Sequence, residues 1–207
     1  MSMPTTARTR AGRTERALAT RTRVVEAASP LFVERGYLET TMADLARAAG
    51  VAVQTLYLSF GSKAAVLEAA LDAVAQDQPS VPPTPAARSG PAVLARHVAV
   101  TVAAVERRAP LDAVLRAAAA DPEPAALLAA ARQEALAAHG RAVDEMAEKP
   151  GFTVELSLQR ATDVLAALLS PETYAMLVVE QGWTTPDWSE WAVRHLTADL
   201  FPATADA

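Results

Sequence analysis

Residues 40–63 read TTMADLARAAGVAVQTLYLSFGSK, and they encode two short helices joined by a tight turn. Met42 and Leu45 recur at helical spacing, which predicts an apolar stripe along the first helix. Thr41 is followed three residues later by Asp44, the pattern of a capping box at a helix start. The first of the two helices is therefore predicted to begin directly after Thr41.

Gly50 predicts the break between the two helices, because glycine can adopt the left-handed conformation just past a helix end. A second helix is expected from about Ala52, carrying Gln54, Thr55 and Tyr57. Two helices crossing at a glycine-containing turn form a helix-turn-helix, whose second helix can enter the major groove of DNA. An ordinary helical hairpin in an all-α core is the alternative for this stretch alone.

The flanking residues favour the DNA-binding interpretation. Residues 24–37, VVEAASPLFVERGY, precede the two helices, and residues 62–67, SKAAVL, follow the turn after them. Together, residues 20–70 resemble the N-terminal DNA-binding domain of the TetR family of transcriptional regulators, with the Ala-Ala, Leu-Phe, Gly-Tyr, Thr-Thr, Ala-Gly-Val, Thr-Leu-Tyr and Ser-Lys elements in the family's order. The resemblance implies the family's fold, a symmetric dimer and DNA binding that a ligand releases.

Composition predicts an all-α protein. Half of the 207 residues are hydrophobic and alanine dominates, whereas aromatic residues make up only 5%. With the resemblance, we expect an N-terminal three-helix helix-turn-helix domain and a C-terminal helical bundle for ligand binding and dimerisation. The chain has no cysteine, no apolar run of membrane-spanning length and no secretory signal, so we expect a cytoplasmic protein that does not enter the membrane.

Charge is divided unevenly along the chain. The net charge is −5, but residues 1–63 hold nine Lys and Arg against five Asp and Glu, and six of those nine lie within the first 23 residues. Residues 64–207 hold ten basic residues against nineteen acidic ones. A basic segment in front of an acidic body is expected when only one end of a protein meets phosphate.

The predicted domain boundaries follow from composition. Residues 1–12 are expected to be a disordered basic arm, either a solvated tail or a segment that gains order on DNA. Residues 13–76 would form the helix-turn-helix domain and residues 91–207 the helical body. Between them, residues 77–90 are rich in proline and are predicted to be a connection rather than a helix.

Proline also predicts the limits of the longer helices. The first should end at Gly36 and be kinked by Pro30. In the body, Pro110, Pro122 and Pro171 each stand where a first helical turn tolerates proline. The helices are expected near residues 91–108, 110–120, 122–147, 154–169, 171–181 and 186–200.

DNA contacts are assigned by position in the helix-turn-helix. Thr41 stands at a helix start, where a hydroxyl and an amide can meet a phosphate. Gln54 can pair with an adenine and Val53 can pack on a thymine methyl. By the resemblance, Tyr57 and Lys63 match family positions that contact backbone phosphate. The full predicted set is Thr40, Thr41, Val53, Gln54, Thr55, Tyr57 and Lys63.

In the body, the apolar segments 154–169 and 171–181 are the expected dimer interface, with an intrachain core as the alternative. An effector pocket is expected among the helices of residues 91–183, with no lining residue identified. Trp183, Trp188 and Trp191 are expected to anchor the last helix. No catalytic or metal-ligand pattern is present, so neither an enzyme nor a cofactor is expected.

The sequence thus predicts a ligand-responsive repressor that a small molecule releases from a palindromic operator in double-stranded DNA. The alternative is a helical ligand-binding or scaffolding protein without site-specific DNA binding. An uncharged recognition helix keeps that alternative open, since phosphate contacts would then supply most of the affinity.

Overall fold

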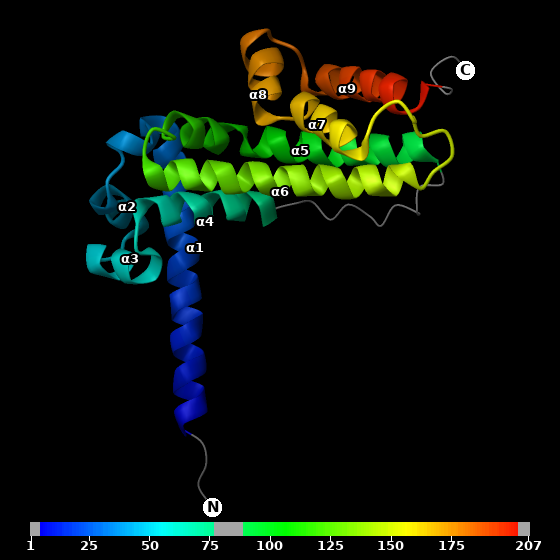
Figure 1. Ribbon diagram of the computed structural model, residues 1–207. Helices are drawn as coiled ribbons and strands as arrows, with labels where there is room; N and C mark the ends of the chain where they lie inside the picture. The colour runs from blue at the N-terminus through cyan, green and yellow to red at the C-terminus, as the bar shows by residue number, and fades with distance from the viewer. Residues whose placement is uncertain (1–4, 77–88, 203–207) are drawn as a thin grey trace, which may run out of the picture. The chain divides into compact units, whose positions relative to one another are not determined.

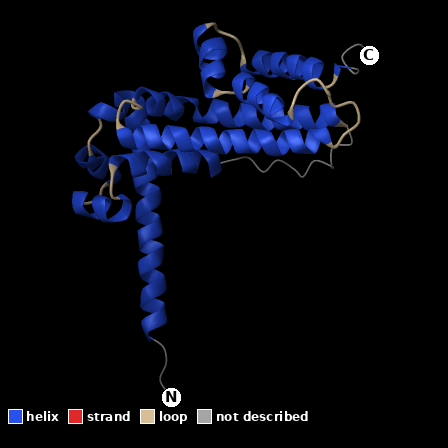
Figure 2. Cartoon of the chain, in the orientation of Figure 1, coloured by secondary structure: helices blue, strands red, loops and turns tan. Residues whose placement is uncertain are grey.

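The computed structural model describes residues 5–76 and 89–202, and within these ranges the regular structure is entirely helical (Figures 1 and 2). This confirms the predicted fold class. The elements are α1 (Thr5–Glu39), α2 (Met42–Ala49), α3 (Val53–Phe60), α4 (Lys63–Gln76), α5 (Gly90–Ala117), α6 (Pro122–Ala147), α7 (Leu158–Leu168), α8 (Pro171–Tyr174), the π-helix η1 (Ala175–Glu180) and α9 (Thr185–Leu200).

The chain forms two compact units, and the division differs from the predicted boundaries. The first unit combines residues 1–76 with residues 110–128, so it includes the last turns of α5 and the first turns of α6. The second unit holds residues 77–109 and 129–207. Most of the predicted connection, residues 77–88, lies outside the described residues, and Gly90 already belongs to α5.

The core of the first unit explains why residues 110–128 belong to it. Helices α1, α2, α3 and α4 contribute Phe32, Leu45, Leu56 and Leu67, each fully buried. Leu111, Val114 and Leu115 of α5 are buried in the same cluster, as is Ala118 just past the end of the helix. The sequence predicts a helix near residues 110–120 but does not show which core its apolar side chains join.

Helices α1 and α5 each contain a proline in their interior, and each continues past it. Helix α1 keeps helical backbone angles at Pro30 and leaves them at Gly36, whose φ is 79° and ψ 170°, so the predicted end is confirmed. Helix α5 continues through Pro110, and the predicted boundary there was wrong. Proline removes one backbone hydrogen bond, which the packing on both sides of Pro110 outweighs. Helix α1 also begins at Thr5, inside the segment predicted to be disordered.

The second unit is built around Trp188, which is fully buried and donates its indole N–H to the Leu168 carbonyl at 3.1 Å. Tyr174 packs edge-on against the same indole. Trp188 therefore anchors α9 as predicted, whereas Trp183 is 36% exposed and contacts α9 only at the surface, through Trp191. In the described part of the chain, residues Leu158–Glu180 are long and apolar enough to cross a membrane by length and composition, but Pro171 starts a new helix within that stretch.

Candidate nucleic-acid interface

The turn between α2 and α3 has the local structure that the sequence predicts. Thr41 caps α2 with a complete capping box, in which its hydroxyl accepts from the Asp44 amide and the Asp44 carboxylate accepts from the Thr41 amide. Gly50 ends α2 in the left-handed conformation, with φ 65° and ψ 38°. Val51 then donates its backbone N–H to the Ala46 carbonyl at 3.0 Å and closes the turn.

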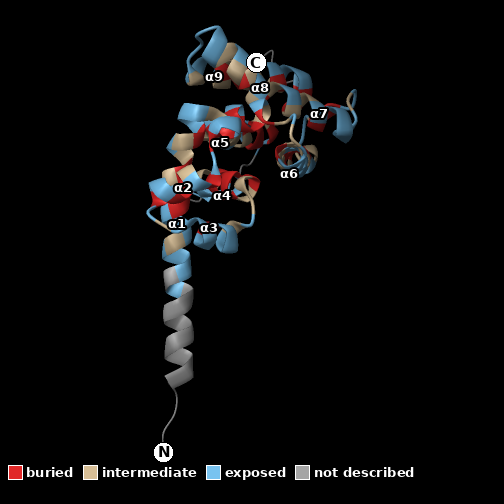
Figure 3. Ribbon diagram, turned by 90° about the vertical axis from the view of Figure 1, so that its left-hand side faces the viewer, coloured by how far each residue is buried: buried red, intermediate tan, exposed pale blue. Residues whose placement is uncertain are grey.

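Helix α3 is held by a single fully buried side chain and leaves the rest of its surface open (Figure 3). Leu56 is 0% exposed and fixes the helix in the core of the first unit. Val53, Tyr57 and Leu58 are 39%, 52% and 82% exposed, which is high for apolar side chains. Gln54 and Thr55 are exposed as well, so the residues that the structure describes leave one face of α3 open, as a helix that enters a groove requires.

Two residues in the predicted contact set have their side-chain groups engaged within the protein. Thr40 is fully buried and donates its hydroxyl to the Gly36 carbonyl at 2.7 Å. The Thr41 hydroxyl donates to the Asp44 carboxylate at 2.6 Å. The hydrogen bonds from the Thr41 hydroxyl and amide lower the pKa of Asp44, so a negative charge stands at the helix start where a phosphate was expected.

Lys63, at the start of α4, is also held by the protein. Its ammonium donates to the Tyr37 carbonyl at 2.6 Å and lies 4.1 Å from the centroid of the Tyr37 ring. Burial lowers the pKa of Lys63, while the carboxylates of Asp121 and Glu39 oppose that shift. An ammonium has three N–H donors, and the hydrogen bond to the Tyr37 carbonyl uses one of them.

Sequence reasoning missed Arg21 and Leu58. The Arg21 guanidinium lies 4.4 Å from the centroid of the Phe60 ring and donates to the Ser59 carbonyl at 3.3 Å, so it fastens α1 to the end of α3. No local pattern connects two residues so far apart in sequence. Leu58 follows Gln54 by one helical turn, and that spacing alone would have placed it on the exposed face.

The second unit contains a buried imidazole pair. His97 Nε2 and His139 Nδ1 are 2.8 Å apart, so one nitrogen donates and the other accepts. His139 is only 4% exposed. Burial lowers the pKa of both rings, that of His97 to about 4, and the neighbouring His139 and Arg96 reinforce the shift at His97. In the described ranges, no group of three or more histidine and carboxylate side chains is arranged to hold a metal ion.

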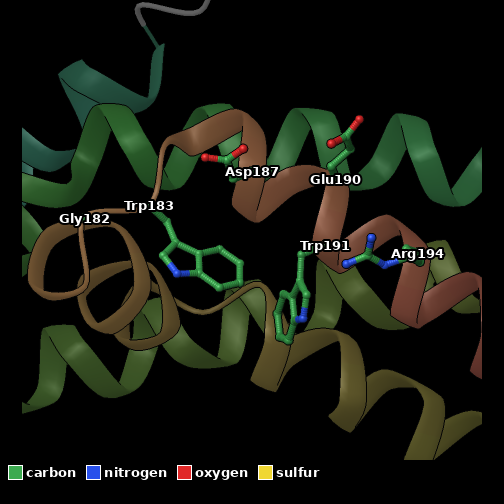
Figure 4. Close-up of a pocket in the computed structure, with 6 residues that line it drawn as sticks. All are labelled: Gly182, Trp183, Asp187, Glu190, Trp191 and Arg194. Atoms are coloured by element: carbon green, nitrogen blue, oxygen red, sulfur yellow. The ribbon is translucent and has the colours of Figure 1, made fainter.

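An open pocket of about 450 Å³ lies on the surface of α9 (Figure 4). Trp183 and Trp191 meet edge-to-face there, with ring centroids 6.0 Å apart. The remaining lining residues are Gly182, Asp187, Glu190 and Arg194. Trp183 and Trp191, two of the three tryptophans predicted to anchor the last helix, thus line an open pocket, and Trp191 also packs against the core of the second unit.

The exposed face of α3, the αL turn before it and the single buried Leu56 define a helix-turn-helix DNA-binding protein. Residues 24–70 match the model of a family described as bacterial regulatory proteins, tetR family. Residues 24–70 are therefore similar to the DNA-binding domain of the TetR family.

Comparisons with individual proteins agree with this assignment. The HTH-type transcriptional regulator TtgR of Pseudomonas putida is 42% identical over 60 residues, and that match spans 29% of each chain. The structure of NalD, the secondary repressor of a multidrug efflux pump in Pseudomonas aeruginosa, aligns with a TM-score of 0.65 at 18% identity, covering 90% of this chain and 98% of NalD. The regulator FadR from Bacillus subtilis, in complex with stearoyl-CoA, aligns with a TM-score of 0.66 at 17% identity, covering 86% and 98%.

Proposed function

We propose that this protein is a ligand-responsive transcriptional repressor, which a small molecule releases from a palindromic operator. The observation that carries the proposal is the open face of α3, where Val53, Gln54, Tyr57 and Leu58 are exposed at i, i+1, i+4 and i+5. A helix that is fixed in the core through Leu56 and exposed on its other side is suited to the major groove. The tetR family model, which matches residues 24–70, covers this same helix.

The contacts divide into base recognition and phosphate binding. Gln54 pairs with an adenine edge, Val53 packs on a thymine methyl, and Thr55 and Tyr57 reach the flanking backbone. Lys63 adds an ammonium at the start of α4.

The two threonines before α2 act mainly by fixing its position. Thr40 closes the loop on Gly36, and Thr41 caps the helix through Asp44. Direct phosphate contact by Thr41 requires the carboxylate of Asp44 to turn away from the hydroxyl.

A dimer and an effector complete the mechanism. Four exposed apolar side chains in residues 154–169 and 171–181 support dimerisation there; they are Val154, Leu158, Met176 and Val179. Since NalD is a repressor and FadR binds stearoyl-CoA, neighbours in fold support a small-molecule effector for this chain. The effector favours a dimer whose two α3 helices no longer match the operator spacing. A regulator of this kind acts in the cytoplasm and needs no catalytic residue or cofactor.

A matched pair of glutamine substitutions tests the role of α3. Gln54→Ala is expected to reduce the affinity for the operator relative to a scrambled duplex by about 5- to 100-fold, which corresponds to the 1–3 kcal/mol of a bidentate base contact. Gln133→Ala, an exposed glutamine on α6, is the control and should leave the ratio unchanged. An equal ratio for both variants would contradict base recognition by Gln54 and favour a ligand-binding or scaffolding role.

A further inference from the structure

The first part of α1, residues 5–23, extends beyond the core of its own unit, and we call it the α1 extension (Figure 1). Among the side chains that the structure describes, the first buried one in the helix is Val24. Before it, Leu18 is 61% exposed, and Arg21 and Arg23 are exposed as well. The side chains that the structure describes in the α1 extension therefore contribute little packing within the chain.

Its composition is unusual for a solvated helix. Residues 5–23 contain six arginines and a single acidic residue, Glu15, which gives a net charge of +5. Cations near a helix N-terminus oppose the helix dipole, and the first turn of α1 has no acidic residue to offset them. A polyanion that covers the α1 extension would remove the repulsion and stabilise the helix.

The end of the α1 extension lies beside the recognition helix. Arg21 donates to the Ser59 carbonyl at 3.3 Å and packs on the Phe60 ring, and both residues are in the last turn of α3. A duplex held by α3 is therefore the polyanion nearest to the α1 extension.

We propose that the α1 extension is a second DNA-binding surface, which contacts backbone phosphates next to the sequence that α3 recognises. This inference rests on the proposed function, because α3 must bring the duplex within reach. The arginines make no fixed base contacts, so they raise affinity for all sequences equally. Each phosphate they neutralise adds to the salt dependence of binding.

The test compares two triple variants of the full-length protein that lose the same charge. Arg8, Arg10 and Arg13 are replaced by Gln in the first, and Arg141, Lys149 and Arg160, from the second unit, are replaced by Gln in the control. The affinity of each for a 40-base-pair duplex of random sequence is measured across salt concentrations. Circular dichroism of each protein with and without the duplex reports helix formation.

In the first variant, the negative slope of log affinity against log salt should become less steep by roughly 0.9 for each phosphate that is no longer neutralised. The slope of the control should equal that of the parent. The parent and the control should gain helicity on DNA, and the first variant should gain less. Equal slopes and equal helicity gains in both variants would overturn the proposal, even if the parent still selects an operator. If the parent selects no sequence from a random pool but the two variants still differ in slope, the proposed function is refuted and the α1 extension remains a DNA-binding surface.

Discussion

The ammonium of Lys63 lies 2.6 Å from the backbone carbonyl oxygen of Tyr37 and 4.1 Å from the centroid of the Tyr37 ring. One side chain thus joins the start of α4 to the residue that follows the break in α1 at Gly36. The Tyr37 ring in turn stacks on Phe32 in the core of the first unit. A residue expected to bind phosphate is also part of the fold that supports the recognition helix.

Lys63→Met is therefore expected to destabilise the protein in the absence of DNA. The variant retains the apolar stem but loses a charged hydrogen bond and a cation–π contact, which together correspond to about 1–3 kcal/mol. Urea denaturation monitored by circular dichroism measures the change. Unchanged stability with weakened DNA binding would show that Lys63 serves the DNA alone.

Gly50→Ala is expected to lower stability by about 1–2 kcal/mol, because alanine must then adopt the left-handed conformation at φ 65°. Gly140→Ala is the matched control. Gly140 lies inside α6, and an added methyl group there would meet only the Thr162 side chain at 4.0 Å. Alanine at this helical position should raise stability by roughly 0.5–1 kcal/mol. Thermal unfolding that shifts in the same direction for both variants would contradict the account of the turn.

Thr41→Val removes the hydroxyl that caps α2 while keeping the shape of the side chain. We expect a loss of about 1 kcal/mol in the free energy of unfolding, whereas Thr41→Ser should retain most of the stability. The orphaned Asp44 carboxylate should also titrate closer to its ordinary pKa, because the Thr41 hydrogen bonds are the main cause of its lowered value. NMR titration of Asp44 in the two variants measures this shift; identical titration curves would contradict it.

Three features of the fold could be predicted from local sequence. The capping box at Thr41, the left-handed Gly50 and the bounds of α6 follow from neighbouring residues, and all three are found as predicted. The contact between Lys63 and Tyr37 joins residues 26 positions apart, and no periodic pattern encodes such a distance.

The prediction that residues 110–128 belong to the helical body was wrong for the same reason. The stripe that begins at Leu111 is apolar whichever core receives it, and only the folded chain selects one. Pro110 was expected to start a helix because proline disfavours helix interiors. Tertiary packing outweighed that preference, and α5 continues through Pro110.

The buried pair of His97 and His139 predicts a loss of stability in acid. The pKa of His97 is lowered to about 4 in the folded protein, below the ordinary value of 6.5 in the unfolded chain. The unfolded chain therefore binds more protons between these values, and stability should fall as pH decreases from about 6.5 to 4. The loss should reach up to about 3 kcal/mol for His97.

His97→Gln is expected to flatten that part of the pH profile, because Gln can still donate to His139 but does not titrate. His195→Gln, on the exposed surface of α9, is the control and should leave the profile as in the parent. Denaturant unfolding at several pH values measures both. A parent profile that is flat between pH 6.5 and 4 would contradict neutral burial of the pair.

The central claim is sequence-specific DNA binding through the exposed face of α3. Selection of bound duplexes from a random pool tests it most directly, with the parent and Gln54→Ala carried through in parallel. The parent is expected to enrich a palindrome, and Gln54→Ala is expected to relax the preference at one symmetric pair of positions. No enriched sequence for the parent, even at low salt, would contradict the claim.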